Sequence, residues 1–244
     1  CNACVQACPK HCIRMQEDSE GFLYPFVDRE SCIDCGLCER VCPVINQNEP
    51  QKPVVTLAAV NSDESVRLAS SSGGIFTSLA ERTIDNGGVV FGAAFDENWD
   101  VKHICIDSKS ELPKLRGSKY VQSIIGNCYK EAKRHLSAGK EVLFSGTPCQ
   151  IAGLKKFLRK DYKNLKTMDI VCHGTPSPLV WRKYLDEVSS MYNIAQITDI
   201  QFRNKAKGWK SYSISISYND ICGNKRTFNE VFTQNIFMRC FLSN

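Results

Sequence analysis

The sequence predicts a small α+β domain rich in cysteine, followed by an α/β domain with a mixed, partly parallel sheet. Eight of the 14 cysteines fall in residues 1–50, which carry a net charge of −4, whereas the remaining residues carry +9. Beyond residue 54, segments typical of buried strands alternate with segments of helical spacing. Because cysteine content and charge both change near residue 50, we expect a domain boundary there.

The overall composition excludes several classes of protein. Apolar residues make up 43% and charged residues 23% of the chain, which is ordinary for a globular protein. No apolar stretch approaches the roughly 18 residues of a membrane helix, so we expect no membrane span. The positive charge is modest and no nucleic-acid-binding module is present, so we expect no nucleic acid as partner. The chain begins at Cys1 rather than Met, so we expect it to be a fragment.

Two cysteine runs carry the most specific signal. Residues 32–43 have the spacing C-x2-C-x2-C-x3-C-P of bacterial ferredoxins, and residues 1–9 match the last three cysteines of a second such run. In these domains the fourth cysteine of each run binds the cluster of the other run. The spacing therefore predicts an α+β ferredoxin-like domain with two [4Fe–4S] clusters. One cluster is expected on Cys8, Cys32, Cys35 and Cys38, and the other on Cys1, Cys4, Cys42 and a cysteine three residues before Cys1.

Two other roles suit these cysteines less well. Cysteines three apart in a tight loop pair poorly as disulfides, and zinc bound by two C-x2-C pairs would leave cysteines over. We interpret the additional Cys12 as a packing thiol. Free thiols that bind metal indicate a reducing compartment, so we expect a cytoplasmic protein.

Local patterns predict the order of elements along the chain. Residues 21–27 are expected to form a short strand that covers the clusters, and residues 46–53, with two prolines, a linker. Strands are predicted at 54–60, 89–95, 101–106, 141–144, 166–171, 197–202 and 212–218, the last in a hairpin with 225–228. Helices are predicted at 74–86, 127–138, 148–159 and 178–192, and residues 230–244 resemble the start of a further helix.

The second part of the chain lacks the ordinary nucleotide fingerprints. There is neither a G-x-G-x-x-G run nor a G-x4-G-K-[ST] loop. Residues 70–74 (Ser-Ser-Ser-Gly-Gly) directly precede a predicted helix, whose free N–H groups suit a phosphate or a simple serine cap. Residues 116–120 and 202–209 are basic and contain aromatic residues, which suits an anionic cofactor or a solvated turn.

Two cysteines follow predicted strands. Gly146 and Thr147 form a tight turn into a helix that starts at Pro148, and Cys149 lies at its positive end, which favours a lowered thiol pKa. Cys172 and His173 end the next strand. If the two strands are parallel neighbours, we expect these groups to meet at one edge of the sheet, where sites commonly form. The alternative is two buried small residues and a capped histidine.

Taken in order, these motifs resemble the family of coenzyme F420 hydrogenase/dehydrogenase beta subunits. The resemblance rests on the ferredoxin-type runs, 71–74, 116–123, 146–150 and 172–178. It implies an N-terminal family domain at 54–125 and a C-terminal one at 126–244, following the ferredoxin domain at 1–50. It also implies bound FAD, a chain that continues past residue 244, and in some members a further [4Fe–4S] cluster in the body, for which Cys149 and Cys172 are candidate ligands. The candidate FAD-binding residues are Ser72, Gly73, Gly74, Ser118, Lys119, Tyr120, Gly146 and Thr147.

The leading hypothesis is therefore a cytoplasmic oxidoreductase that passes electrons between [4Fe–4S] clusters and FAD. The expected partners are an electron-carrier protein or redox subunit and a small redox coenzyme or organic substrate, with His173 as a proton donor near the flavin. Two alternatives stay open at this point: a flavin-free ferredoxin-type relay that docks to a partner, and a structural zinc protein.

Overall fold

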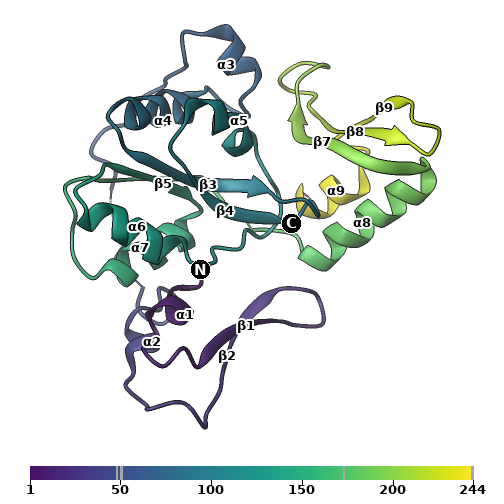
Figure 1. Cartoon of the computed structure of the whole chain (residues 1–244). Helices are drawn as coiled ribbons and strands as arrows, with labels where there is room; N and C mark the ends of the chain where they lie inside the picture. Colours follow the sequence, from purple (N-terminus) through teal and green to yellow (C-terminus); the bar gives the residue numbers. More distant parts are fainter. Residues whose placement is uncertain (48, 50–51, 173, 243–244) are drawn as a thin grey trace.

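The computed structural model describes residues 1–47, 49, 52–172 and 174–242 (Figure 1). It has a cysteine-rich head at the N-terminus, a central mixed sheet covered by helices on both faces, and a separate antiparallel sheet packed with two helices. Among these described residues, no helix is long and apolar enough to cross a membrane.

The head is built from two short helices and one hairpin. The predicted strand at 21–27 is confirmed as β2, which pairs antiparallel with a strand that the sequence analysis missed, β1. Ile13 of β1 lies opposite Val27 of β2, and both pack with the cysteines. The bounds of the head elements are α1 Ala3–Ala7, β1 Ile13–Glu17, β2 Leu23–Val27 and α2 Leu37–Arg40.

The central sheet has the strand order β4-β3-β5-β6. The pairs β3–β5 and β5–β6 are parallel and β3–β4 is antiparallel, so the predicted mixed, partly parallel sheet is confirmed. The strands are β3 Val89–Phe95, β4 Val101–Ile106, β5 Val142–Gly146 and β6 Leu165–Asp169. All five residues of β5 are buried, because this strand has a neighbour on each side and a helix layer on each face.

Alternate residues of the strands face two different helix layers. Phe91 and Phe144 pack against one layer, made by α6 (Cys128–Ser137) and α7 (Pro148–Leu158). Val90 and Leu143 pack against the other layer, which includes α4 (Ile75–Asp85) and α5 (Leu112–Leu115). The short elements α3 (Glu64–Leu68) and η1 (Lys109–Glu111) were not predicted.

The predicted strand at 197–202 and the predicted hairpin form a sheet of their own. This antiparallel sheet has the order β7-β8-β9 and shares a core with α8 and α9 around the fully buried Trp181. The strand and helix bounds are α8 Pro178–Met191, β7 Ile194–Asn204, β8 Ser213–Asp220, β9 Lys225–Val231 and α9 Ile236–Leu242.

Two predictions about elements were wrong. Residues 54–60 form no strand and are exposed, with Val54 at 99% and Leu57 at 81% of full exposure. A strand needs a hydrogen-bonding partner, and among the described residues this segment pairs with no strand of the sheet. Residues 230–231 are the end of β9 rather than the start of a helix, because Glu230 pairs with Ile214 of β8; the helix begins only at Ile236.

The head packs directly on the body. Ala3 and Val41 are almost fully buried in the core that α6 and α7 share with the central sheet. The Gln6 side-chain oxygen accepts hydrogen bonds from the backbone N–H groups of Tyr129 and Lys130, each at 3.0 Å. The linker predicted at 46–53 lies partly outside the described residues, at positions 48, 50 and 51.

Candidate functional site

One predicted cysteine set surrounds a cavity in the head. This cavity of about 280 Å³ lies between the loop that begins at Cys32 and the segment around Cys8. Positive backbone φ angles at Asp34 and Gly36 curl the loop so that its three thiols surround the same space. The cysteines that line it are Cys8, Cys12, Cys32, Cys35 and Cys38.

The other predicted set faces the body. The thiols of Cys4 and Cys42 are neighbours, and burial together with the nearby Cys42 raises the pKa of Cys4. Cys1 packs against α7 at Gly153, where an added Cβ would lie 3.0 Å from the Cys1 Cβ and 3.1 Å from its sulfur. A glycine at this position of α7 therefore lets Cys1 approach the helix closely.

Cys12 is buried, as expected for a packing thiol, but it is not remote from the predicted ligands. Its sulfur lies 3.4 Å from the sulfur of Cys8. Cys12 packs in the small apolar cluster of the head with Ile13 and Val27.

The two predicted phosphate-type loops of the body meet in the fold. The backbone N–H of Ser118 donates to the Ser71 side chain at 2.6 Å. Gly74 begins α4 with a φ angle of +81°, a conformation that favours glycine. Gly73 lies against the exposed segment 54–60, since an added Cβ would come within 2.7 Å of the carbonyl oxygen of Ala59. The fold thus brings the loops at 70–74 and 116–120 and the segment 54–60 next to one another.

Five cations gather around these loops, and we call them the basic cradle: Arg67, Arg116, Lys119, Arg203 and Lys205. Lys119 donates to the carbonyl oxygens of Arg116 and Gly117, and Lys205 donates to those of Arg67 and Ser70. Within the described part of the chain, no carboxylate oxygen lies within 4 Å of these five cations.

Burial lowers the pKa of lysines in this cradle. It lowers the pKa of Lys119 to about 8, and burial with the nearby Arg203 also lowers the pKa of Lys205. The buried Nε of Arg203 has no hydrogen-bond partner within the described residues. A bound anion would raise the lowered lysine pKa values and give the Arg203 N–H a partner, because a negative charge stabilises the ammonium form and offers acceptors to N–H groups.

Aromatic rings line the same region. Tyr120, a predicted cofactor-binding residue, stacks on Phe241 with ring centroids 4.5 Å apart. The ammonium of Lys205 lies 4.0 Å from the centroid of the Trp209 ring, and the guanidinium of Arg203 lies 4.5 Å from that of Tyr212. The two basic stretches that the sequence analysis singled out therefore form one region, rather than two separate turns.

The turn after β5 has the predicted form. Thr147 caps α7 in a capping box with Gln150, and Pro148 occupies the first turn. The carbonyl of Ser145, just before this turn, accepts a hydrogen bond from Nε2 of the buried His103 at 3.0 Å, and the other ring nitrogen accepts from Ser123 at 2.7 Å. Burial lowers the pKa of His103 to about 4, so its ring is neutral.

The predicted cysteines of the body lie at one edge of the sheet. β5 and β6 are parallel neighbours, and Cys149 and Cys172 follow their carboxyl ends. Both cysteines are exposed; the Cys149 sulfur lies 3.2 Å from the Thr147 hydroxyl. Their role as cluster ligands stays a prediction. His173 lies outside the described residues, and its proposed role as proton donor also stays a prediction.

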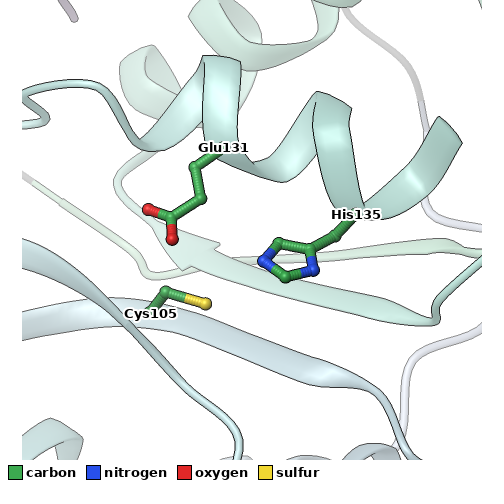
Figure 2. Close-up of side chains that lie close together, drawn as sticks. All are labelled: Cys105, Glu131 and His135. Atoms are coloured by element: carbon green, nitrogen blue, oxygen red, sulfur yellow. The ribbon is translucent and has the colours of Figure 1, made fainter. Parts of the chain in front are cut away.

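One group of side chains was not predicted from the sequence. Cys105 of β4 points towards α6, and Glu131 and His135 point back towards it from the helix (Figure 2). One ligand atom of each residue lies within 4.8 Å of the other two. The spacing of four between Glu131 and His135 places both on one helix face, but no local pattern connects them to Cys105.

Three segments of the chain match models of known protein families. Residues 1–46 match the model of a 4Fe-4S dicluster domain. Residues 56–127 match the N-terminal part of the coenzyme F420 hydrogenase/dehydrogenase beta subunit. Residues 139–235 match the C-terminal part of the same beta subunit. The head is therefore an iron–sulfur domain of the ferredoxin type.

Three similar proteins share much of this chain. One subunit of the F(420)H(2) dehydrogenase of Methanosarcina mazei is 22% identical over 86% of this chain and 62% of its own length. Coenzyme F420-dependent sulfite reductase of Methanocaldococcus jannaschii is 25% identical over 76% of this chain and 29% of its own length. A chain of the F420-reducing [NiFe] hydrogenase complex of Methanosarcina barkeri is 20% identical, with a TM-score of 0.44, over 70% of this chain and 58% of its own length.

This chain thus spans less than two thirds of each of these proteins. The two beta-subunit models match in the expected order and together cover most of the residues beyond the head. On these matches, the chain belongs to the family of coenzyme F420 hydrogenase/dehydrogenase beta subunits.

Proposed function

We propose that this protein is an iron–sulfur flavoprotein subunit that passes electrons between two [4Fe–4S] clusters and FAD. The observation that carries the proposal is the coexistence of two cysteine sets in the head with a basic cradle in the body. Two relatives are, by name, a subunit of an F420H2 dehydrogenase and a coenzyme F420-dependent sulfite reductase. We therefore propose a small redox coenzyme or a partner redox subunit as the further reactant.

The division into domains forms part of this proposal. Residues 1–50 would hold the clusters, while residues 54–125 and 126–244 would form the N-terminal and C-terminal parts of the flavin-binding body. The basic cradle draws Lys119 from the first of these parts and Lys205 from the second.

The cysteine sets fit two clusters. Cys8, Cys32, Cys35 and Cys38 line one cavity, which suits four thiolates arranged around one cubane. Cys1, Cys4 and Cys42 would supply three thiolates of the second. The first set opens to solvent beside Lys10, Arg29 and the exposed Ile33, which supports docking of an electron-carrier protein there. The second set lies against α7 of the body.

The basic cradle fits the phosphates of FAD. Lys119 and Lys205 are partly buried ammonium groups without carboxylate partners among the described residues, and Arg203 has an unpaired buried N–H. Ser72, Gly73 and Gly74 at the start of α4, with Ser118, would add hydroxyl and backbone donors. Tyr120 would supply an aromatic surface, and Gly146 and Thr147 would contact the cofactor from the turn after β5.

Each part of the chain then has a defined task. When bound, the clusters carry single electrons and the flavin exchanges two, which connects one-electron carriers to an organic coenzyme. The cradle neutralises phosphate charge, the aromatic residues exclude water, and the packing of Ala3, Gln6 and Val41 holds the head at a constant distance from the body. Cys149 and Cys172 are candidate ligands for a third cluster.

The proposal is tested by the cofactor content of anaerobically purified protein. Iron, sulfide and flavin per chain should be measured before and after incubation with FAD, in the wild type and in Cys35→Ser. Cys222→Ser is the matched control, because Cys222 is an exposed thiol in the turn after β8. We expect iron, sulfide and about one flavin per chain, with iron and sulfide reduced in Cys35→Ser alone.

The outcomes separate the proposal from its alternatives. Iron and sulfide without flavin, even after FAD is added, would support the flavin-free relay and overturn the flavoprotein. Zinc without sulfide in the head would overturn both electron-transfer proposals. With flavin bound, reduction of a small redox coenzyme or of an artificial acceptor would establish the oxidoreductase activity.

A further inference from the structure

A group of side chains whose chemistry suits a metal ion lies outside the head and the cradle. Cys105 lies on the face of β4 that packs against α6, and Glu131 and His135 lie one turn apart on α6 (Figure 2). All three side chains are half-buried, and their ligand atoms lie within 4.8 Å of one another. None of them belongs to the ferredoxin-type runs.

We propose that Cys105, Glu131 and His135 bind one zinc ion between β4 and α6, with water as the fourth ligand. Sulfur, imidazole nitrogen and carboxylate oxygen are the ligand atoms that zinc takes in proteins, and three protein ligands with one open position form a known type of zinc site. Calcium and magnesium require oxygen ligands and are excluded by the thiol and the imidazole.

The geometry needs only small side-chain movements to close around the ion. Zinc–ligand distances of about 2.0–2.3 Å at tetrahedral angles bring the ligand atoms closer together than the present limit of 4.8 Å. Glu131 and His135 can close this gap by rotation of their side chains, since both already point towards Cys105 (Figure 2). The ring of Phe91 packs edge-on against His135, with centroids 6.3 Å apart, and limits the orientations of the imidazole.

The charges around the group also favour a cation. A thiolate and a carboxylate together balance the two charges of zinc. Asp107 lies near enough to act electrostatically on both Cys105 and His135. Arg134, which lies 3.6 Å from Glu131, and Lys140 oppose the cation. Arg134 has an exposed side chain, so it can turn away to solvent.

A zinc ion at this position would connect the helix that receives the head to the central sheet. Gln6 of the head binds the first turn of α6, while Glu131 extends from the first turn and His135 from the last turn of the same helix. The ion would therefore strengthen the part of the body on which the iron–sulfur head rests.

The test is zinc binding to the anaerobic protein with its clusters assembled. Equilibrium dialysis with radioactive zinc measures affinity in a coloured protein, and X-ray absorption at the zinc edge reports the ligand atoms. The variants are Cys105→Ser, His135→Gln and Glu131→Gln, and the control is Cys222→Ser, which removes an exposed thiol elsewhere. We expect the wild type and the control to bind one zinc, with one sulfur and otherwise nitrogen or oxygen ligands.

The three variants should bind zinc at least about tenfold more weakly, because even loss of an outer-shell partner commonly costs that much. Iron and sulfide per chain should stay unchanged, which shows that the head is intact. Zinc bound by four sulfurs, or zinc binding of unchanged affinity in Glu131→Gln and His135→Gln, would overturn the proposal. Glu131 and His135 are half-buried helix positions, at which substitution by Gln should allow the protein to fold. These two variants therefore test the proposal even if Cys105→Ser fails to fold.

Discussion

Lys119 is a cation that has no carboxylate partner among the described residues. Its ammonium donates to the carbonyl oxygens of Arg116 and Gly117 and lies 5.8 Å from the centroid of the Phe95 ring. Backbone carbonyls are weaker partners for an ammonium than a carboxylate, so burial dominates and lowers the pKa to about 8. A phosphate of FAD would reverse this effect by favouring the charged form.

We therefore predict that FAD binding weakens as the pH rises through about 8. In the free protein Lys119 loses its proton above this pH, while the phosphate-bound form retains it, so binding requires proton uptake. Affinity should fall by up to about tenfold per pH unit above that value. Lys119→Met should weaken binding at pH 7 and reduce this slope. The slope should be reduced rather than abolished, because Lys205, whose pKa is also lowered, is present in both the wild type and the variant.

Flavin fluorescence titrations between pH 7 and 9 measure this effect. Lys114→Met is the control, because Lys114 is an exposed lysine paired with Glu111 on the surface. An equal slope in the wild type and in Lys119→Met would show that Lys119 does not contact the phosphates.

Among the elements, residues 54–60 show that an apolar run alone does not establish a buried strand. The run predicts a buried strand, yet Val55 is 65% and Leu57 81% exposed. By contrast, β5 (Val-Leu-Phe-Ser-Gly) has a smaller share of apolar residues and is fully buried between β3 and β6. The difference is pairing: β5 is paired with β3 and β6, whereas residues 54–60 pair with no strand among the described residues, and no local signal reveals which apolar run will find a partner.

This difference predicts unequal effects of substitution. Leu57→Gln should change the free energy of unfolding by less than about 0.5 kcal/mol, as expected of an exposed side chain. Leu143→Ala in β5, at 1% exposure, should cost about 2–5 kcal/mol. Urea denaturation followed by circular dichroism measures both values. A cost for Leu57→Gln close to that of Leu143→Ala would mean that this segment is buried.

At the scale of the whole molecule, the head caps the N-terminal turn of a helix of the body. Asn127 precedes α6 but makes no side-chain cap, so the first N–H groups of this helix need another acceptor. Gln6, which is 4% exposed, supplies that acceptor from 123 residues away in the sequence. An ion pair of 2.9 Å between Glu17 of the hairpin and Arg182 of α8 adds a second contact to the body.

Gln6→Ala should consequently loosen the head. Loss of the acceptor leaves the N–H groups of Tyr129 and Lys130 without their partner, at a cost of about 1–3 kcal/mol. Hydrogen exchange at these two amides should accelerate, and the free energy of unfolding should fall. Gln16→Ala, at an exposed position of β1, is the control and should leave both unchanged. Equal protection of the two amides in both variants would contradict the capping role of Gln6.

Much of the fold could be predicted because its signals are local. The periodicity around α4, α6, α7 and α8 and the alternation in β8 depend only on near neighbours, and the structure confirms these elements. The loops at 70–74 and 116–120 could be predicted as candidate sites one by one. Their contact through Ser118 and Ser71 could not, because 47 residues separate them.

The sequence by itself determined the iron–sulfur character of the head, since the spacing of its cysteines reflects how a short loop surrounds a cluster. It also determined the alternation of strands and helices in the body. Only the tertiary structure decided which strands pair, that the second sheet is separate, that five cations share one cradle, and that Cys105 meets Glu131 and His135. These features depend on contacts between distant parts of the chain, and their free energy comes from shared burial that no short segment encodes alone.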